Sequence, residues 1–78
     1  MKTKKSLDTQ FAVCIDNSEY PASLELHKIY VVIPDDNALE SGDLRIIDES
    51  GEDYLYPADW FVLVELPKKV EKSLLKVA

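Results

Sequence analysis

Few side chains in this sequence could combine into a catalytic arrangement. The 78 residues include one cysteine, Cys14, and one histidine, His27, so a cysteine–histidine nucleophile would have to use that pair. Cys14 falls in a predicted strand and His27 in a predicted turn, and a lone cysteine is most often a small core side chain. No glycine-rich phosphate loop is present. We therefore expect no catalytic residues, no cofactor and no enzymatic activity.

Carboxylates cluster around Gly51, and carboxylate oxygens are ligands that calcium prefers. The cluster consists of Asp48, Glu49, Glu52 and Asp53, and a second acidic pair is formed by Asp35 and Asp36. Their spacing lacks the alternating ligands of a helix–loop–helix calcium loop. A charged hairpin tip exposed to water accounts for the cluster, because turn residues are usually polar. We therefore predict no metal site.

Aromatic side chains with acidic neighbours are the stronger candidates for binding. The six candidate binding residues are Glu19, Tyr20, Tyr54, Pro57, Asp59 and Trp60. Tyrosine and tryptophan supply much of the energy at protein interfaces, and their ring faces attract cations. An aromatic patch with an acidic rim therefore suits a basic or arginine-containing segment of a partner protein. The alternative is that Trp60 and Tyr56 only cover the end of a small core.

The distribution of charge favours a protein partner over a nucleic acid. The net charge is −6, but residues 11–66 alone carry −11, from thirteen carboxylates against Lys28 and Arg45. Residues 1–10 carry +2 and residues 67–78 carry +3. The negative charge of residues 11–66 argues against nucleic-acid binding, because such binding depends on lysine and arginine side chains that neutralise phosphates. The carboxylates also serve solubility, and we expect the isolated protein to be a monomer.

Composition places the chain among ordinary globular proteins. The hydrophobic share is 46%, enough for a core, and the length allows one domain. No apolar run approaches a membrane span, and the start lacks the apolar stretch of a signal peptide. A single cysteine cannot form an intramolecular disulfide. We expect a cytoplasmic protein that does not engage a membrane.

Period-two alternation of apolar residues predicts several short strands. The expected strands are 10–16, 29–33, 44–48, 53–56 and 61–66, with a further apolar piece at 24–26. A short helical turn is expected near 38–40, and another begins at Pro57. His27 lies where the chain must turn tightly, and histidine tolerates a positive φ better than most residues. Residues 1–9 are predicted to be a flexible basic tail, residues 10–66 a small β-barrel domain, and residues 67–78 a short amphipathic helix.

This order of elements resembles a Src homology 3 barrel. Residues 51–62, which read GEDYLYPADWFV, resemble the exit of that family's distal hairpin, and residues 24–32 resemble its diverging turn and second strand. The resemblance covers residues 11–66 and implies an all-β fold, a five-stranded Src-homology-3-like barrel with a short C-terminal helix. The core segments also look like a group of short uncharacterised bacterial proteins, a resemblance that implies no activity.

The residues that bind proline-rich peptides in that family are matched only in part. Pro57 and Trp60 correspond to the proline and tyrosine of the family's helical turn. Cys14 and Asp16 stand where the first strand would carry tyrosines, and Leu44 stands where a tryptophan would open the third strand. Polyproline helices dock in grooves lined by stacked aromatics. The resemblance therefore implies the barrel without a ligand class.

We expect a small cytoplasmic interaction module that binds a protein segment through its aromatic and acidic face. One alternative is a structural or regulatory subunit of an enzyme complex, an interpretation that depends on fold analogy. A third is an acidic decoy of nucleic acid, suggested by the −11 carried by residues 11–66. The apolar stripe of the C-terminal helix either packs on its own domain or docks on a partner.

Overall fold

The computed structural model describes residues 9–77, so most of the predicted basic tail lies outside the described residues. The elements in chain order are β1 (Gln10–Cys14), β2 (Ile29–Ile33), α1 (Asp36–Glu40), β3 (Asp43–Ile47), β4 (Asp53–Pro57), the 3₁₀ helix η2 (Ala58–Trp60), β5 (Phe61–Val64) and α2 (Lys68–Val77). Each predicted strand from 29 onward, both helical turns and the C-terminal helix are present within two residues of their expected bounds.

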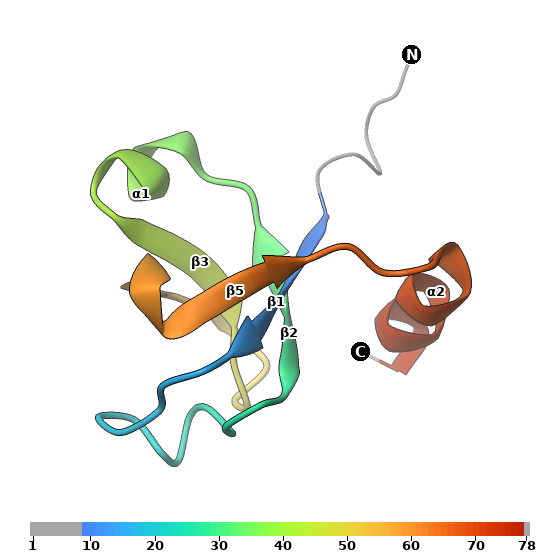
Figure 1. Ribbon diagram of the computed structural model, residues 1–78, viewed down its shortest axis with the longest axis horizontal. Helices are drawn as coiled ribbons and strands as arrows, with labels where there is room; N and C mark the ends of the chain where they lie inside the picture. The colour runs from blue at the N-terminus through green and yellow to red at the C-terminus, as the bar shows by residue number, and fades with distance from the viewer. Residues whose placement is uncertain (1–8, 78) are drawn as a thin grey trace.

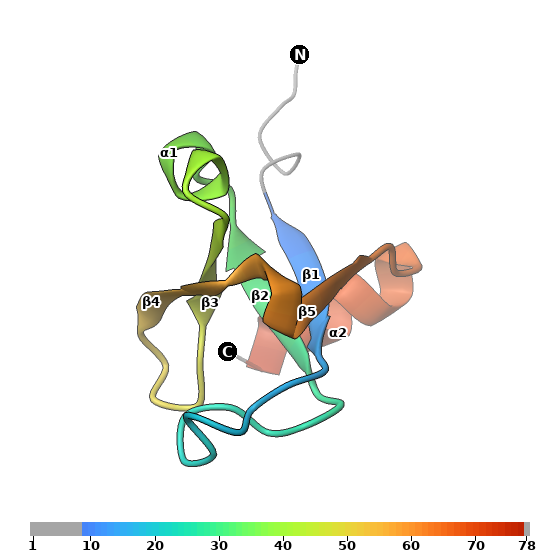
Figure 2. The same cartoon turned by 60° about the vertical axis from the view of Figure 1, so that its left-hand side comes forward.

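The strands form one antiparallel five-stranded sheet in the order β4-β3-β2-β1-β5 (Figures 1 and 2). Strands consecutive in the chain pair antiparallel from β1 to β4, and β5 returns to the far side of β1. The predicted all-β class with a short C-terminal helix is thereby confirmed. Within residues 9–77, β4 and β5 are the two edges, and no pairing joins them into a closed sheet.

The core follows from the alternation of apolar residues along these strands. Its members are Ala12, Cys14, Leu24, Tyr30, Val32, Leu44, Ile46, Tyr56 and Phe61. Alternate residues of a strand face opposite sides, so positions two apart share the buried face. Tyr30 and Tyr56 bring hydroxyl groups into this core, and each is paired: Tyr30 donates to Glu49 and Tyr56 donates to Asp48. Both buried hydroxyl groups therefore have the hydrogen-bond partners that polar atoms in a core require.

The first predicted strand ends two residues early, at Cys14, because Asp16 starts a side-chain turn. The Asp16 carboxylate accepts hydrogen bonds from the Ser18 backbone N–H at 3.0 Å and from the Ser18 hydroxyl at 2.8 Å. Aspartate commonly makes such local bonds and thereby competes with strand pairing. The segment from Ile15 to Lys28, here named the first loop, then crosses the end of the sheet before β2 begins.

Asp35 anchors the helical turn that follows β2. Its carboxylate caps α1 by accepting from the Ala38 backbone N–H at 3.0 Å, and it also pairs with Arg45 at 2.7 Å. Arg45 extends this pairing to Asp53 on β4 at 2.9 Å. The Ala38 bond and the Arg45 guanidinium hold the pKa of Asp35 below its ordinary value. The predicted acidic pair at residues 35–36 therefore contains a helix cap.

Helix α2 lies beyond the end of β5, to the right of the sheet in Figure 1. Leu74 is half-buried and shares a hollow with Phe11, Ile29 and Val31 on the outer face of β1 and β2. Leu75 stays exposed. The helix thus turns one apolar side chain toward its own domain.

His27 adopts the left-handed backbone conformation, with a φ of 67°, in the tight turn that was predicted there. Replacing His27 with glycine should keep the free energy of unfolding or raise it by up to about 1 kcal/mol, because glycine adopts this φ without strain. His27→Val should lower the free energy by about 1–2 kcal/mol, because a β-branched residue resists this conformation. Urea denaturation measures both variants. A loss of stability with glycine as large as that with valine would contradict this interpretation.

Candidate functional site

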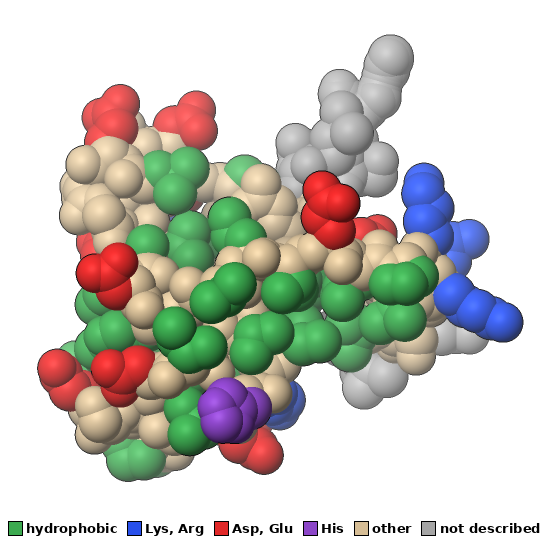
Figure 3. All heavy atoms as spheres, in the orientation of Figure 1, with side chains coloured by type: hydrophobic (Ala, Val, Ile, Leu, Met, Phe, Trp, Pro, Cys, Tyr) green, Lys and Arg blue, Asp and Glu red, His purple; other side chains and the backbone are tan. Residues whose placement is uncertain are grey.

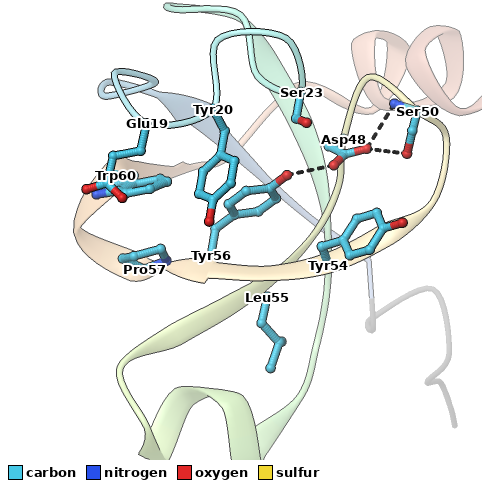
Figure 4. A pocket seen from close by; sticks show the side chains of 10 residues that line it. All are labelled: Glu19, Tyr20, Ser23, Asp48, Ser50, Tyr54, Leu55, Tyr56, Pro57 and Trp60. Atoms are coloured by element: carbon cyan, nitrogen blue, oxygen red, sulfur yellow. Dashed lines mark hydrogen bonds between the residues drawn. The ribbon is translucent and has the colours of Figure 1, made fainter.

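A groove of about 580 Å³ opens between the first loop, the β3–β4 turn, β4 and η2 (Figure 4). The residues lining it are Glu19, Tyr20, Ser23, Asp48, Ser50, Tyr54, Leu55, Tyr56, Pro57 and Trp60. Five of the six candidate binding residues are in this set. The exception is Asp59, which is exposed on η2 and does not line the groove.

Three aromatic rings in contact form the wall of the groove. Tyr20 comes from the first loop, Tyr56 from β4 and Trp60 from η2. The ring centroids are 5.7 Å apart for Tyr20 and Tyr56, 5.8 Å for Tyr20 and Trp60, and 6.1 Å for Tyr56 and Trp60. These separations are those of tilted and edge-to-face aromatic pairs. The rings therefore touch one another and present a continuous aromatic surface.

The aromatic residues differ in how much surface they offer to a ligand. Tyr56 is buried and belongs to the core, whereas Tyr20 is 50% exposed and Tyr54 is 49% exposed. Trp60 is half-buried and packs against the core. Tyr54 and Tyr56 lie two residues apart on β4 and point to the same side of the strand, while Leu55 points the other way (Figure 4). Core and ligand surface are thus continuous here.

Asp48 lines the groove and holds the Tyr56 side chain in place. Its carboxylate accepts from the Tyr56 hydroxyl at 2.6 Å, the Ser50 hydroxyl at 2.6 Å and the Ser50 backbone N–H at 2.9 Å (Figure 4). Asp48 is 6% exposed, so the prediction that it belongs to a water-exposed hairpin tip was wrong. Sequence reasoning also missed its role, although aspartate two residues before serine is typical of a side-chain turn.

The ionisation of this pair follows from the same bonds. Burial opposes ionisation of Asp48, but the hydrogen bonds from Ser50 and Tyr56 hold the pKa of its carboxyl below the ordinary value. Burial, together with the hydrogen bond to Asp48, raises the pKa of Tyr56 to about 12. Asp48 is therefore an anion and Tyr56 a neutral hydrogen-bond donor at neutral pH.

The other carboxylates around Gly51 are divided among separate partners. Glu49 accepts from Lys28 at 2.7 Å and from Tyr30, and these bonds lower the pKa of Glu49. Glu52 accepts from the Tyr54 hydroxyl at 3.1 Å. Asp53 pairs with Arg45. Among residues 9–77, no group of three or more histidine, cysteine or acidic side chains converges as metal ligands would.

Glu19 is the acidic residue at the outer rim of the groove. It is exposed, and no salt bridge engages it in the described part of the chain. Asp48 at the base is fully committed to Tyr56 and Ser50. A cationic ligand would therefore meet Glu19 first and the aromatic surface next.

Cys14 and His27 lie close in the fold but not as a reactive pair. The His27 backbone N–H donates to the Cys14 carbonyl at 2.7 Å, while the His27 side chain is exposed and Cys14 is buried in the core. The Cys14 thiol points to the Asp16 carbonyl at 3.5 Å. Burial raises the pKa of this thiol, which disfavours the thiolate that a nucleophile needs.

Comparisons of the chain with protein families, with curated proteins and with solved structures found no match. Among the described helices, none has the length and apolar character to cross a membrane.

Proposed function

We propose that this chain is a protein-interaction module that holds a segment of a partner protein in the aromatic groove. The observation that carries the proposal is the convergence of Tyr20, Tyr54, Pro57 and Trp60 on one groove from the first loop, β4 and η2. Exposed aromatic residues beside a groove are the usual anchors of protein interfaces. A core alone does not require Tyr20 and Tyr54 to remain half exposed.

The shape of the aromatic surface limits what the groove accepts. An aromatic cage for a methylated ammonium needs space between its rings, whereas Tyr20, Tyr56 and Trp60 already touch. A side chain would instead lie flat on the exposed faces, as a guanidinium or an apolar group can. Glu19 at the rim and the net charge of −6 favour a basic segment. We therefore assign a basic, arginine-containing protein segment as the ligand class.

We further propose that the open sheet belongs to the Src-homology-3-like barrels. In support, the strand order and the 3₁₀ turn between β4 and β5 agree with that architecture, and Pro57 and Trp60 both line the groove. The family's peptide mode does not transfer with the fold, because Cys14 is buried and Leu44 belongs to the core. Function here is argued from the groove and not from the architecture.

The test is affinity capture from the native cytosol with the folded full-length chain as bait. The double variant Tyr54→Ala with Trp60→Ala removes two of the anchors, and we expect it to bind the captured partner at least tenfold more weakly, since anchor residues contribute roughly 2 kcal/mol or more. The matched control is Leu39→Ala, which removes an exposed apolar side chain on α1, outside the groove. Circular dichroism verifies that both variants fold.

The outcomes separate this proposal from its alternatives. A partner retained by the wild type and by Leu39→Ala, but lost by the double variant, supports a groove that binds a protein segment. Equal retention by all three proteins would move the interface to another surface and favour a structural subunit of a larger complex. Absence of any partner at low and at moderate salt would count against a protein-binding module. Competition by DNA for a captured partner would favour the acidic decoy.

A further inference from the structure

The backbone of β5 exposes a free hydrogen-bonding edge. The Ile15 N–H donates to the Trp60 carbonyl at 2.8 Å, and the register continues with Val13 opposite Val62. Because hydrogen-bonded pairs alternate in an antiparallel ladder, Val62 faces β1 while the backbone groups of Leu63 face away from it. Within residues 9–77, β5 pairs with β1 alone. The N–H and C=O of Leu63 therefore point to an unpaired edge.

The opposite edge of the sheet is protected, and that of β5 is not. On β4 the outward-facing backbone groups belong to Asp53, Leu55 and Pro57, since Tyr54 and Tyr56 pair with β3. Proline has no N–H, and charged residues also discourage a further strand. The four residues of β5 include neither a proline nor a charge. Although the charged Glu65 follows β5, the strand itself contains neither, so of the two sheet edges within residues 9–77 the β5 edge is the better suited to receive another strand.

The side chains of β5 are apolar and exposed on both sides of this edge. Val62 is 49% exposed and Leu63 is 53% exposed. Figure 3 shows hydrophobic side chains in a band along β5 that continues toward α2. Isolated exposed apolar residues are common, but a continuous apolar band along a free strand edge is typical of an interface.

We propose that a second copy of this chain pairs with this edge, β5 against β5, about a two-fold axis at Leu63. The two Leu63 residues would then exchange both backbone hydrogen bonds. Two further bonds would join the Glu65 N–H of each copy to the Phe61 carbonyl of the other, since the Phe61 carbonyl also faces outward while its N–H bonds Ala58. Leu63 would meet Leu63 on one face, and Val62 would meet Val64 on the other.

The arrangement of charge makes this edge complementary to itself. Antiparallel pairing of the two β5 strands brings the η2 end of one copy, with exposed Asp59, to the same side as the α2 end of the other, where Lys68 and Lys69 are exposed. Figure 3 shows the lysines at the α2 end and a concentration of acidic side chains at the opposite end. A two-fold axis brings the acidic end of each copy beside the lysine-bearing end of the other. An interface that pairs a surface with itself requires this arrangement. The proposed pairing differs from the monomer expected from composition, because net charge does not reveal a free strand edge.

Sedimentation equilibrium of the full chain across a wide concentration range tests the pairing. We expect a reversible dimer whose dissociation constant rises at least about a hundredfold in Leu63→Lys, because two lysines would then oppose each other at the axis. The matched control Leu39→Lys adds the same charge at an equally exposed position on α1 and should dimerise as the wild type does. A wild type that stays monomeric at millimolar concentration, or a Leu63→Lys variant that dimerises normally, would overturn the proposal.

Charge-reversal variants that leave the β5 residues unchanged test how the two edges are arranged. Asp59→Lys and Lys68→Asp should each weaken dimerisation about tenfold, and the double variant should restore it. Failure of the double variant to restore it would overturn the antiparallel arrangement of the two edges. Hydrogen exchange gives a readout without mutation: the Leu63 and Glu65 amides should become protected as concentration rises, while the Val62 amide stays protected throughout. Rapid exchange of Leu63 at every concentration would exclude the paired edge.

Discussion

Replacing Leu24 with alanine is expected to lower the free energy of unfolding by about 2–5 kcal/mol. Leu24 belongs to the first loop, yet its side chain is fully buried in the core. Its N–H donates to the Tyr20 carbonyl at 3.0 Å, and its carbonyl accepts from the Asn17 amide at 3.0 Å. The substitution therefore leaves a cavity and also loosens the loop that carries Tyr20. Urea denaturation followed by the fluorescence of Trp60, the single tryptophan, measures the change.

Leu26→Ala is the matched control for this prediction. Leu26 lies two residues further along the same loop and is exposed, so its truncation should change the free energy of unfolding by less than about 0.5 kcal/mol. Similar losses in the two variants would contradict the assignment of Leu24 as the anchor of the first loop. A loss confined to Leu24→Ala, together with weaker binding in the groove, would tie core packing to the position of Tyr20.

Replacing Asp48 with alanine is expected to lower the free energy of unfolding by about 1.5–3 kcal/mol at neutral pH. The variant leaves the buried Tyr56 hydroxyl and the Ser50 N–H without their acceptor, and hydrogen bonds to a charged group contribute in this range. Glu40→Gln, an exposed change on α1, serves as the control and should have little effect. Chemical denaturation measures both variants, and equal stability of Asp48→Ala and the wild type would contradict this role.

The contribution of Asp48 should also depend on pH with a definite sign. The folded protein holds the pKa of Asp48 below its ordinary value of 3.8, so folding favours the ionised carboxylate. Its stabilisation is therefore complete above the ordinary pKa and is lost as pH falls through the lower folded value. Asp48→Asn does not titrate, so the stability difference between it and the wild type should shrink below about pH 4. A difference that stays constant down to pH 2 would exclude this linkage.

The candidate site shows how far local patterns reach. Pro57 and Trp60 could be placed on one helical turn from their spacing, and Tyr54 could be assigned to a strand with a partly exposed face. That Tyr20 lies against Trp60, forty residues further along the chain, was expected only from the resemblance to a barrel. The distance between these rings depends on how the first loop packs. The buried side chain of Leu24 anchors that loop to the core.

Asp48 marks the limit of such reasoning. In the sequence it is one of four carboxylates around a glycine, and its spacing to Ser50 indicates a local turn without indicating that the carboxylate is buried. Each of the four acquires a different partner because β3, β4 and the first loop bring Tyr56, Lys28, Tyr54 and Arg45 to different sides of the turn. Burial of a carboxylate is favourable only with such donors, and for Asp48 the local donor Ser50 is joined by Tyr56 from the next strand.

By itself, the sequence determined the strand-rich class, the order of the elements, the tight turn at His27 and the 3₁₀ turn after Pro57, because these depend on alternation and backbone sterics within a few residues. Only the tertiary structure decided which carboxylates are buried, that Asp59 lies outside the groove, and that β5 has an unpaired edge. Those properties depend on which strands become neighbours, and strand neighbours are selected by packing of the whole core.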